Sequence, residues 1–213
     1  MRRLLSFHAL LVYLFLYLPI LVVVALSFNE SRRGVHFPGF TLKWYQGLFQ
    51  DPRVLEYFAN TLVVALVSTL VSTVLGTLLA LGLVRYRFPG KGFLRYLLYV
   101  PVVVPDVVMG VSLLLLFAFS RELLGFPRLS LLTVILGHIT FQVAFVTLVV
   151  RSRLLLLDPA LEEAARDLGA RGFQTFLHVT LPLAWPGVAA GALLALTLSL
   201  DDFVVTFFTA GPG

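Results

Sequence analysis

Three carboxylates, Asp106, Asp201 and Asp202, stand within long runs of apolar residues. A charged side chain at the centre of a bilayer costs at least about 2.5–3.5 kcal/mol, so acids there usually line a pathway or have a partner. Carboxylates along a path suit a cationic solute, whereas an anion would require basic groups, and no Lys or Arg lies deep in any apolar run. We therefore take the three acids as candidates for a substrate pathway. The structural alternative for each is a helix cap or a pair with an interfacial arginine.

His138 offers a second kind of chemistry, because a membrane-embedded histidine that meets a serine could serve an intramembrane protease. A hydrogen bond from this histidine to a neighbouring helix is the simpler interpretation, and we favour it. The sequence contains neither the H-E-x-x-H of zinc proteases nor the G-x-S-x-G of serine hydrolases. We expect no metal site and no catalytic residue, and we keep an intramembrane enzyme that uses His or Asp as the alternative function.

The elements that carry these residues are apolar segments of membrane length. Hydrophobic residues make up 59% of the 213 residues and charged residues only 13%, which nearly excludes a water-soluble enzyme. A helix needs about 20 predominantly apolar residues to cross the hydrocarbon core. Five runs qualify, and they predict an all-α membrane protein, a polytopic helical bundle in contact with membrane lipid: Leu4–Phe28, Thr61–Val84, Leu94–Phe119, Leu129–Val150 and Leu183–Ala210.

Proline and small residues predict how these helices are shaped and packed. Pro101 and Pro105 should interrupt the third helix around Asp106, which we place near the middle of the membrane. Asp202 shares the face of Ser199 in the fifth run, so we expect it to matter more than Asp201. Small residues recur every four positions in the second and fifth runs and indicate faces that pack closely on other helices: Ser68, Ser72, Gly76, Ala80, Gly187, Gly191, Ala195 and Ser199.

The distribution of basic residues predicts the orientation of the chain. Ten of the 16 Lys and Arg fall on the inner side if the N-terminus is cytoplasmic, and the loop Arg85–Arg95 is the clearest part of this bias. We therefore expect a multi-pass protein of the cell (inner) membrane with a cytoplasmic N-terminus, a retained first span and an external segment that includes Arg32 and Arg33. The formal charge of +5 then reflects cytoplasmic loops, and we expect no nucleic-acid partner.

A long internal segment at about 151–182 has its own pattern. Asp158-Pro159 signals a helix start, Gly169 suits a left-handed helix end, and a second short apolar helix follows until Pro182 ends it. This pattern predicts a helix–Gly–helix hairpin on the cytoplasmic face. The hairpin is either an ordinary structured loop or a docking element for another protein, because three of its apolar residues need a partner: Phe173, Phe176 and Leu177.

The hairpin also contains a family motif. Glu163-Ala-Ala165, three residues, Gly169, nine residues and Val179-Thr-Leu-Pro182 resemble the EAA motif of ABC importer permeases, with Val179 in place of the usual Ile. In that family the hairpin is a coupling helix that sits in a groove of the ATPase subunit. The resemblance implies that coupling to the ATPase falls on these residues: Glu163, Ala164, Ala165, Gly169, Val179, Leu181 and Pro182.

The same resemblance implies that residues 1–213 form a single transmembrane permease domain, with the coupling hairpin at about 151–182. The sequence has no G-x-x-x-x-G-K-[ST] loop for phosphates, so we expect no cofactor on this chain and ATP on a partner subunit. The implied partners are an ABC ATPase dimer, a second permease subunit and an extracytoplasmic solute-binding protein. ATP would close the ATPase dimer and move the hairpin, and the helices would rock to expose the cavity alternately to the two sides.

Two further stretches narrow the resemblance. Pro105–Phe117 and Ser199–Phe203 resemble spermidine/putrescine permease subunits, which implies transport of a polyamine (spermidine or putrescine) or of another cationic solute, iron included. Permeases of this kind normally have a sixth span after a Gly-Pro-Gly-like loop, whereas this sequence stops at Gly211-Pro212-Gly213. We accordingly expect five spans, without the usual sixth.

Overall fold

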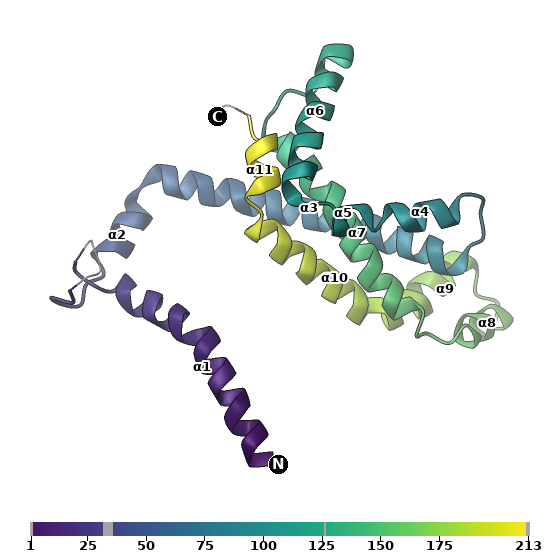
Figure 1. Ribbon diagram of the computed structural model, residues 1–213. Coiled ribbons are helices and arrows are strands. Elements are labelled where there is room, and N and C mark those ends of the chain that lie inside the picture. Colours follow the sequence, from purple (N-terminus) through teal and green to yellow (C-terminus); the bar gives the residue numbers. More distant parts are fainter. Residues whose placement is uncertain (1, 32–35, 126, 212–213) are drawn as a thin grey trace. The chain divides into compact units, whose positions relative to one another are not determined.

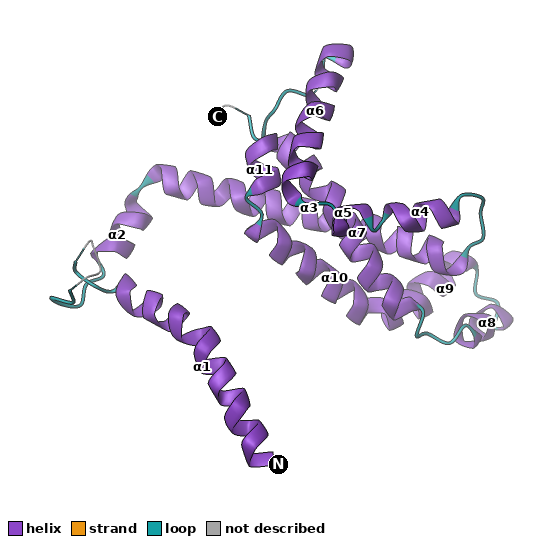
Figure 2. Ribbon diagram, viewed as in Figure 1, coloured by secondary structure: helices purple, strands orange, loops and turns teal. Residues whose placement is uncertain are grey.

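The computed structural model describes residues 2–31, 36–125 and 127–211, so Arg32, Arg33 and the terminal Pro212-Gly213 lie outside the described residues. Figures 1 and 2 show helices joined by turns and loops. Five of the described helices are long and apolar enough to cross a membrane, which confirms the predicted all-α membrane class. The contacts group the chain into two compact units, residues 1–58 and 59–213, which we describe separately. The single permease domain stays a prediction.

The first unit contains α1 (Arg2–Ser27) and α2 (Lys43–Gln50). None of the most apolar stretch of α1 is buried within the described chain, so lipid or another subunit has to cover it. In the segment after α1, Trp44 Nε1 donates a hydrogen bond to the carbonyl oxygen of Asn29 at 2.9 Å. The Phe28 ring stacks on Phe40 with the ring centroids 5.2 Å apart. These contacts fold the segment back onto the end of α1.

The core of the second unit is built by α7 (Leu131–Leu154), α10 (Leu181–Asp201) and the part of α3 (Pro52–Arg85) that belongs to this unit. All eight small residues predicted to mark packing faces on α3 and α10 are buried. A Cβ on Gly76 would lie 2.7 Å from Val146 Cγ1, and a Cβ on Gly187 would lie 2.5 Å from Arg153 Cβ. Both neighbours belong to α7, so small residues let α3 and α10 approach this helix closely. The predicted close packing is confirmed.

The third predicted span is divided. Residues 91–124 form α4 (Lys91–Leu97), α5 (Val100–Val103) and α6 (Asp106–Leu124). Val104 and Pro105 between them are extended, with ψ of 131° and 140°, because a proline lacks an N–H and disfavours a helical residue before it. The predicted interruption is confirmed. The expected span Leu94–Phe119 is wrong in its bounds, since the membrane-length helix begins at Asp106, and this acid lies in a first turn and not in the middle of a helix.

The fifth predicted span, Leu183–Ala210, is also not a single helix. α10 ends at Asp201, and a separate short helix, α11 (Val204–Thr209), follows after Asp202 and Phe203. Asp202 is extended, with ψ 123°, and its Oδ2 accepts a hydrogen bond from the Thr206 N–H at 2.9 Å. The carboxylate therefore caps a new helix where continuation was expected. The chain turns at this point, so that α11 packs against α6 and α7 (Figure 1).

The internal hairpin forms as predicted, with α8 (Ala160–Asp167) and α9 (Gly172–Thr175) on either side of Gly169. Gly169 has φ +89°, the expected left-handed conformation. Asp158 Oδ1 accepts a hydrogen bond from the Ala160 N–H at 2.9 Å and thus caps α8.

Pro182 does not end the second helix of the hairpin, and this expectation is wrong. A π-helical turn, η1 (Phe176–Thr180), carries α9 directly into α10, and the two form one helix from Gly172 to Asp201. In this turn the Leu181 N–H bonds to the carbonyl oxygen of Phe176, five residues earlier. A proline in a regular helix leaves one carbonyl without its N–H partner, and its ring clashes with that carbonyl. The π-helical turn lies directly before Pro182, so the helix departs from the regular hydrogen-bond pattern at this point.

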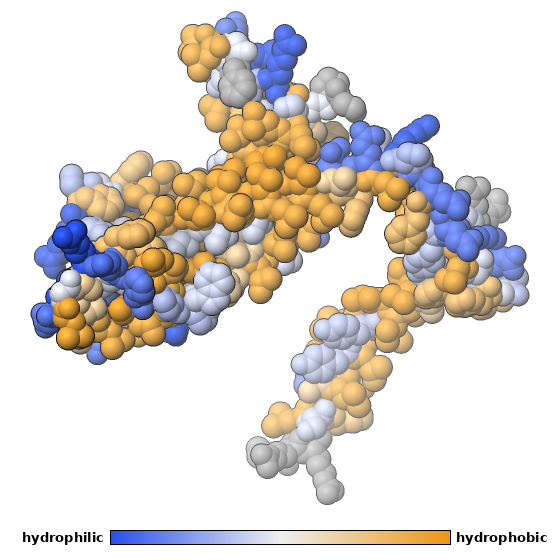
Figure 3. Space-filling model, turned by 180° about the vertical axis from the view of Figure 1, so that it is seen from behind, coloured by the Kyte–Doolittle hydropathy of each residue, from blue (hydrophilic) through white to orange (hydrophobic). Residues whose placement is uncertain are grey.

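Figure 3 shows how hydropathy is distributed over the surface. Hydrophobic residues cover the long sides of the helices of the second unit, whereas hydrophilic residues gather at the end that carries the hairpin. Large apolar side chains such as Leu66, Leu70 and Leu115 are more than half exposed. This pattern fits a bundle whose sides face lipid and whose ends face water.

Gly76→Leu should destabilise the protein, whereas Gly82→Leu on the same helix should not. A side chain at Gly76 meets Val146 and the backbone of Thr147, with the Thr147 nitrogen 3.1 Å from the new Cβ, while nothing lies within 4 Å of a Cβ at Gly82. Overpacking costs about 1–3 kcal/mol. Thermal unfolding of the detergent-solubilised variants measures the difference, and equal midpoints would contradict the packing described here.

Candidate functional site

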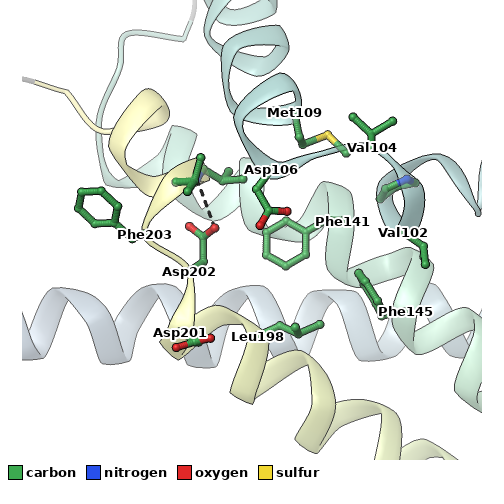
Figure 4. Close-up of a pocket in the computed structure, with 13 residues that line it drawn as sticks. Val102, Val104, Asp106, Met109, Phe141, Phe145, Leu198, Asp201, Asp202 and Phe203 are labelled. Atoms are coloured by element: carbon green, nitrogen blue, oxygen red, sulfur yellow. Dashed lines mark hydrogen bonds between the residues drawn. The ribbon is translucent and has the colours of Figure 1, made fainter.

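The structure gathers the three candidate acids at one cavity in the second unit. Asp106, Asp201 and Asp202 all line a hollow of about 280 Å³ at the junction of α5, α6, α7, α10 and α11. The remaining described lining residues are apolar, and none of them is basic: Pro101, Val102, Val104, Met109, Phe141, Phe145, Leu198, Phe203, Val204 and Val205. Residues almost one hundred positions apart in sequence therefore share one acidic, aromatic-walled space (Figure 4).

Asp106 reaches this cavity from the first turn of α6. The extended residues Val104 and Pro105 direct the chain into that turn, where a carboxylate is favoured by the positive end of the helix dipole. Its side chain is exposed, and no ion pair involves it among the described residues. Figure 4 shows its carboxylate beside the Phe141 ring. Asp106 therefore presents a charge to the cavity that no basic group in the described chain compensates.

Asp202 lies at the same cavity but has several partners. Its Oδ2 accepts hydrogen bonds from the Thr206 N–H at 2.9 Å and the Thr206 hydroxyl at 3.0 Å. Its Oδ1 accepts one from the Val205 N–H at 3.2 Å, and His138 Nε2 lies 3.3 Å from Oδ2. These contacts match the helix-cap alternative for this acid. Asp201 ends α10 and is exposed.

A chain of buried polar groups runs inward from Asp202. His138 Nδ1 lies 2.7 Å from Ser199 Oγ, and its Nε2 lies 2.9 Å from the Thr206 hydroxyl. Ser199 Oγ is 3.4 Å from Ser68 Oγ, which accepts a hydrogen bond from Gln142 Nε2 at 3.1 Å. The prediction that His138 bonds to a neighbouring helix is confirmed. Sequence reasoning missed Gln142, although its position one helical turn after His138 was a signal that both share a face.

Asp202, His138 and Ser199 are the three residue types of a serine-protease catalytic triad, but their setting does not suit catalysis. Ser199 and His138 are 4% and 1% exposed, so no substrate reaches either side chain in this arrangement. Ser199 also shares its hydroxyl with Ser68 at the helix contact. The three residues therefore hold α7, α10 and α11 together, and the arrangement lends no support to an intramembrane enzyme.

The motif residues of the hairpin occupy different environments. Glu163 and Ala164 are exposed on α8, whereas Ala165, Val179 and Leu181 are half-buried. A shallow hollow of about 480 Å³ lies between the two arms of the hairpin, lined by Ala165, Leu168, Gly169, Ala170, Gln174, His178 and Val179. The apolar side chains of Leu168 and Phe173 are 90% and 73% exposed, so the hairpin presents apolar surface without a cover in the described chain.

Sequence reasoning missed Glu162, the neighbour of the motif glutamate. It is 7% exposed, and its Oε1 accepts hydrogen bonds from Arg85 Nε at 3.0 Å and from the Thr180 hydroxyl at 2.9 Å. Glu162 and Glu163 are adjacent acids in the first turn of α8, so sequence alone gives both the same helix-dipole interpretation. The fold separates them, with one side chain turned inward and the other exposed.

Comparison with known proteins identifies the family. Residues 72–213 match the family described as binding-protein-dependent transport system inner membrane component. The chain is 44% identical over 201 residues to the spermidine/putrescine transport system permease protein PotC of Escherichia coli (strain K12), covering 94% of this chain and 74% of that protein. It is 41% identical over 206 residues to the putrescine transport system permease protein PotI of the same strain, covering 96% and 73%.

Solved structures share the fold. The crystal structure of a bacterial ABC transporter involved in the import of the acidic polysaccharide alginate matches with a TM-score of 0.74 at 19% identity, over 99% of this chain and 79% of that one. A bacterial alginate ABC transporter in complex with its pentasaccharide-bound periplasmic protein matches with a TM-score of 0.72 at 20% identity, over 99% and 78%. The family match and the relatives together show that this chain belongs to the inner-membrane components of binding-protein-dependent transport systems and is a non-catalytic, multi-pass permease subunit of an ABC importer.

Proposed function

We propose that this permease carries a polyamine, spermidine or putrescine, or another cationic solute. The observation that carries the proposal is the cavity at which three carboxylates meet without a basic lining residue in the described chain. Carboxylates bind ammonium groups, and aromatic faces such as those of Phe141 and Phe145 attract cations and accept the methylene segments between them. The names of the relatives PotC and PotI support the same class of solute.

The driving step takes place on partner chains. ATP bound by an ABC ATPase dimer would close that dimer, and the hairpin docked in its groove would move with it. The exposed residues Glu163, Ala164, Leu168 and Phe173 support such a docking surface. A second permease subunit would complete the pathway, and an extracytoplasmic solute-binding protein would deliver the solute to the external side. The N-terminus would lie in the cytoplasm.

The three acids have different roles in this proposal. Asp106 has no charged partner among the described residues, so its charge is available to the solute. Asp202 is occupied by α11 and His138, so its first role is to hold the cavity wall. We therefore revise the ranking expected from sequence, in which Asp202 mattered more than Asp201. Asp106 and Asp201 contact the solute, and Asp202 shapes the site.

Asp106→Asn should weaken uptake while leaving the amount of the subunit in the membrane unchanged, because the side-chain shape is kept and only the charge is lost. A hydrogen bond to a charged group contributes about 1.5–3 kcal/mol, so uptake at low solute concentration should fall about tenfold or more. Uptake of labelled spermidine or putrescine and immunoblots of the membrane fraction measure both quantities.

Asp202→Asn provides the contrast for this measurement. It should lower membrane abundance and uptake together, because the amide weakens the cap of α11 and the contact with His138. Normal uptake by Asp106→Asn at normal abundance would remove Asp106 from the pathway.

Gly169→Val should uncouple the ATPase while leaving the spans folded. Nothing lies within 4 Å of a Cβ at Gly169, so the penalty comes from its φ of +89°, which costs a non-glycine residue roughly 1–2 kcal/mol. Gly172→Ala is the matched control, because Gly172 also has open space around it and no positive φ. ATP hydrolysis stimulated by the loaded binding protein, measured in the whole importer, reports the coupling. Stimulation that survives Gly169→Val unchanged would contradict the coupling role.

The proposed orientation can be tested with a reporter that is active only in the cytoplasm. Insertion at Gly90, in the basic loop after α3, should give activity, and insertion at Arg128, after α6, should give none. The reverse pattern would place the N-terminus outside.

A further inference from the structure

The inner end of the second unit is held by a buried ion pair and a hydrogen bond that together join three elements. We call Arg85, Glu162 and Thr180 the Glu162 cluster. Glu162 Oε1 lies 3.0 Å from Arg85 Nε at the end of α3 and 2.9 Å from the Thr180 hydroxyl in η1. The side chains of Arg85 and Glu162 are 18% and 9% exposed. The cluster therefore joins the hairpin helix α8 to the last residue of α3 and to the turn that leads into α10.

Because the pair is buried, the charge of Arg85 and the charge of Glu162 each need the other for compensation. Arg85 Nη2 is itself buried and has no hydrogen-bond partner in the described chain, so Glu162 supplies the compensation for this guanidinium. Removing one partner of a buried pair leaves an uncompensated charge. Arg166 also faces Glu162, but its nitrogen lies 3.7 Å away and its side chain is 58% exposed, so it contributes little.

Most described residues around the first arm of the hairpin are exposed, among them Leu155, Leu161 and Glu163. Leu157, before α8, packs against the core of the second unit. Glu162 is the buried residue of α8. A displacement of α8 is therefore passed to the bundle most directly through the carboxylate of Glu162.

The elements that receive this displacement lead to the acid-lined cavity. Thr180 closes η1, and the same continuous helix runs on to Asp201, which lines the cavity. Between these points Gly187 packs against Arg153, and Ser199 bonds to His138, so the helix is held against α7 along its length. π-Helical turns occur frequently at functional sites within helices. The turn η1 lies between the hairpin helix α9 and α10.

We propose that Glu162 is a positioning residue that transmits movement of the hairpin to α3 and α10 through Arg85 and Thr180. The inference rests on the proposed docking of the hairpin on the ATPase and adds the internal link that docking alone does not supply. Without this link the hairpin still binds the ATPase, but its movement no longer changes the cavity.

The test separates docking from transmission with introduced cysteines, which suits a chain that has none of its own. In the complete importer, with its ATPase, second permease and binding protein, Leu168→Cys on the exposed hairpin reports cross-linking to the ATPase. A pair of spin labels at Met109 and Leu198, which both line the cavity, reports its ATP-dependent opening and closing. Neither readout depends on which solute is carried. The central variant is Glu162→Gln, which keeps the side-chain shape and removes the charge.

We expect Glu162→Gln to retain the cross-link at Leu168 while the fraction of molecules that change at the cavity with ATP falls about tenfold, a size usual for coupling between sites. Thr180→Val, which loses only the hydroxyl, should reduce the change in the same direction. Combining Arg85→Glu with Glu162→Arg should restore part of the response, because the ion pair is rebuilt with its charges exchanged. Arg87→Gln is the control, since Arg87 is exposed in the loop that follows Arg85 and lies outside the cluster.

Three results would overturn the inference. A full ATP-dependent change at the cavity in Glu162→Gln would show that the carboxylate transmits nothing. Loss of the cross-link together with the cavity change would make Glu162 a residue needed only to fold the hairpin. Absence of the cross-link in the importer with native Glu162 would overturn the proposed docking itself, and this inference with it.

Discussion

The arrangement of the second unit depends on how closely α3 and α10 approach α7. Lipid tails are as apolar as leucine side chains, so helices in a membrane associate through close packing and polar contacts and not through exclusion of water. Gly76 on α3 and Gly187 on α10 leave room for Val146 and Arg153 on α7. This close approach encloses Ser68, His138 and Ser199, whose polar groups then satisfy one another across the helix contacts.

The same contacts shape the cavity. His138 holds Ser199 near the end of α10 and contacts Thr206 in α11, and Asp202 caps α11 from the break between the two helices. The break allows α11 to pack on α6, whose first residue is Asp106. Asp106, which begins α6, is thereby brought to the same space as Asp201, which ends α10, and Asp202, which follows it. The cavity is thus a product of two helix interruptions, one at Pro105 and one at Asp202 and Phe203.

One continuous helix connects the hairpin to the acid-lined cavity. It begins beside the hairpin at Gly172, passes through the π-helical turn and ends at Asp201 in the cavity wall. Pro182 would weaken a regular helix at this point, yet the helix continues through it directly after this turn. The buried pair of Glu162 and Arg85 fixes the hairpin to the start of this helix and to α3. A helix tied at its start and packed along its length is suited to pass a displacement from one end to the other.

Much of this could be read from the sequence, because the responsible forces act over short stretches of chain. Hydropathy over about 20 residues located the spans, the four-residue repeat of small residues marked the packing faces, and the need for a left-handed residue explained Gly169. Asp158-Pro159 and Gly169 predicted the hairpin, and the EAA-like spacing within it indicated the family. The tertiary structure decided which distant residues meet. Glu162 and Arg85 are separated by 77 positions and His138 and Ser199 by 61, so no local pattern pairs them. It also decided that the helix continues through Pro182, where Thr180 in the preceding turn bonds to Glu162 of the hairpin. At Asp202 the helix breaks, and the carboxylate there meets His138 of another helix.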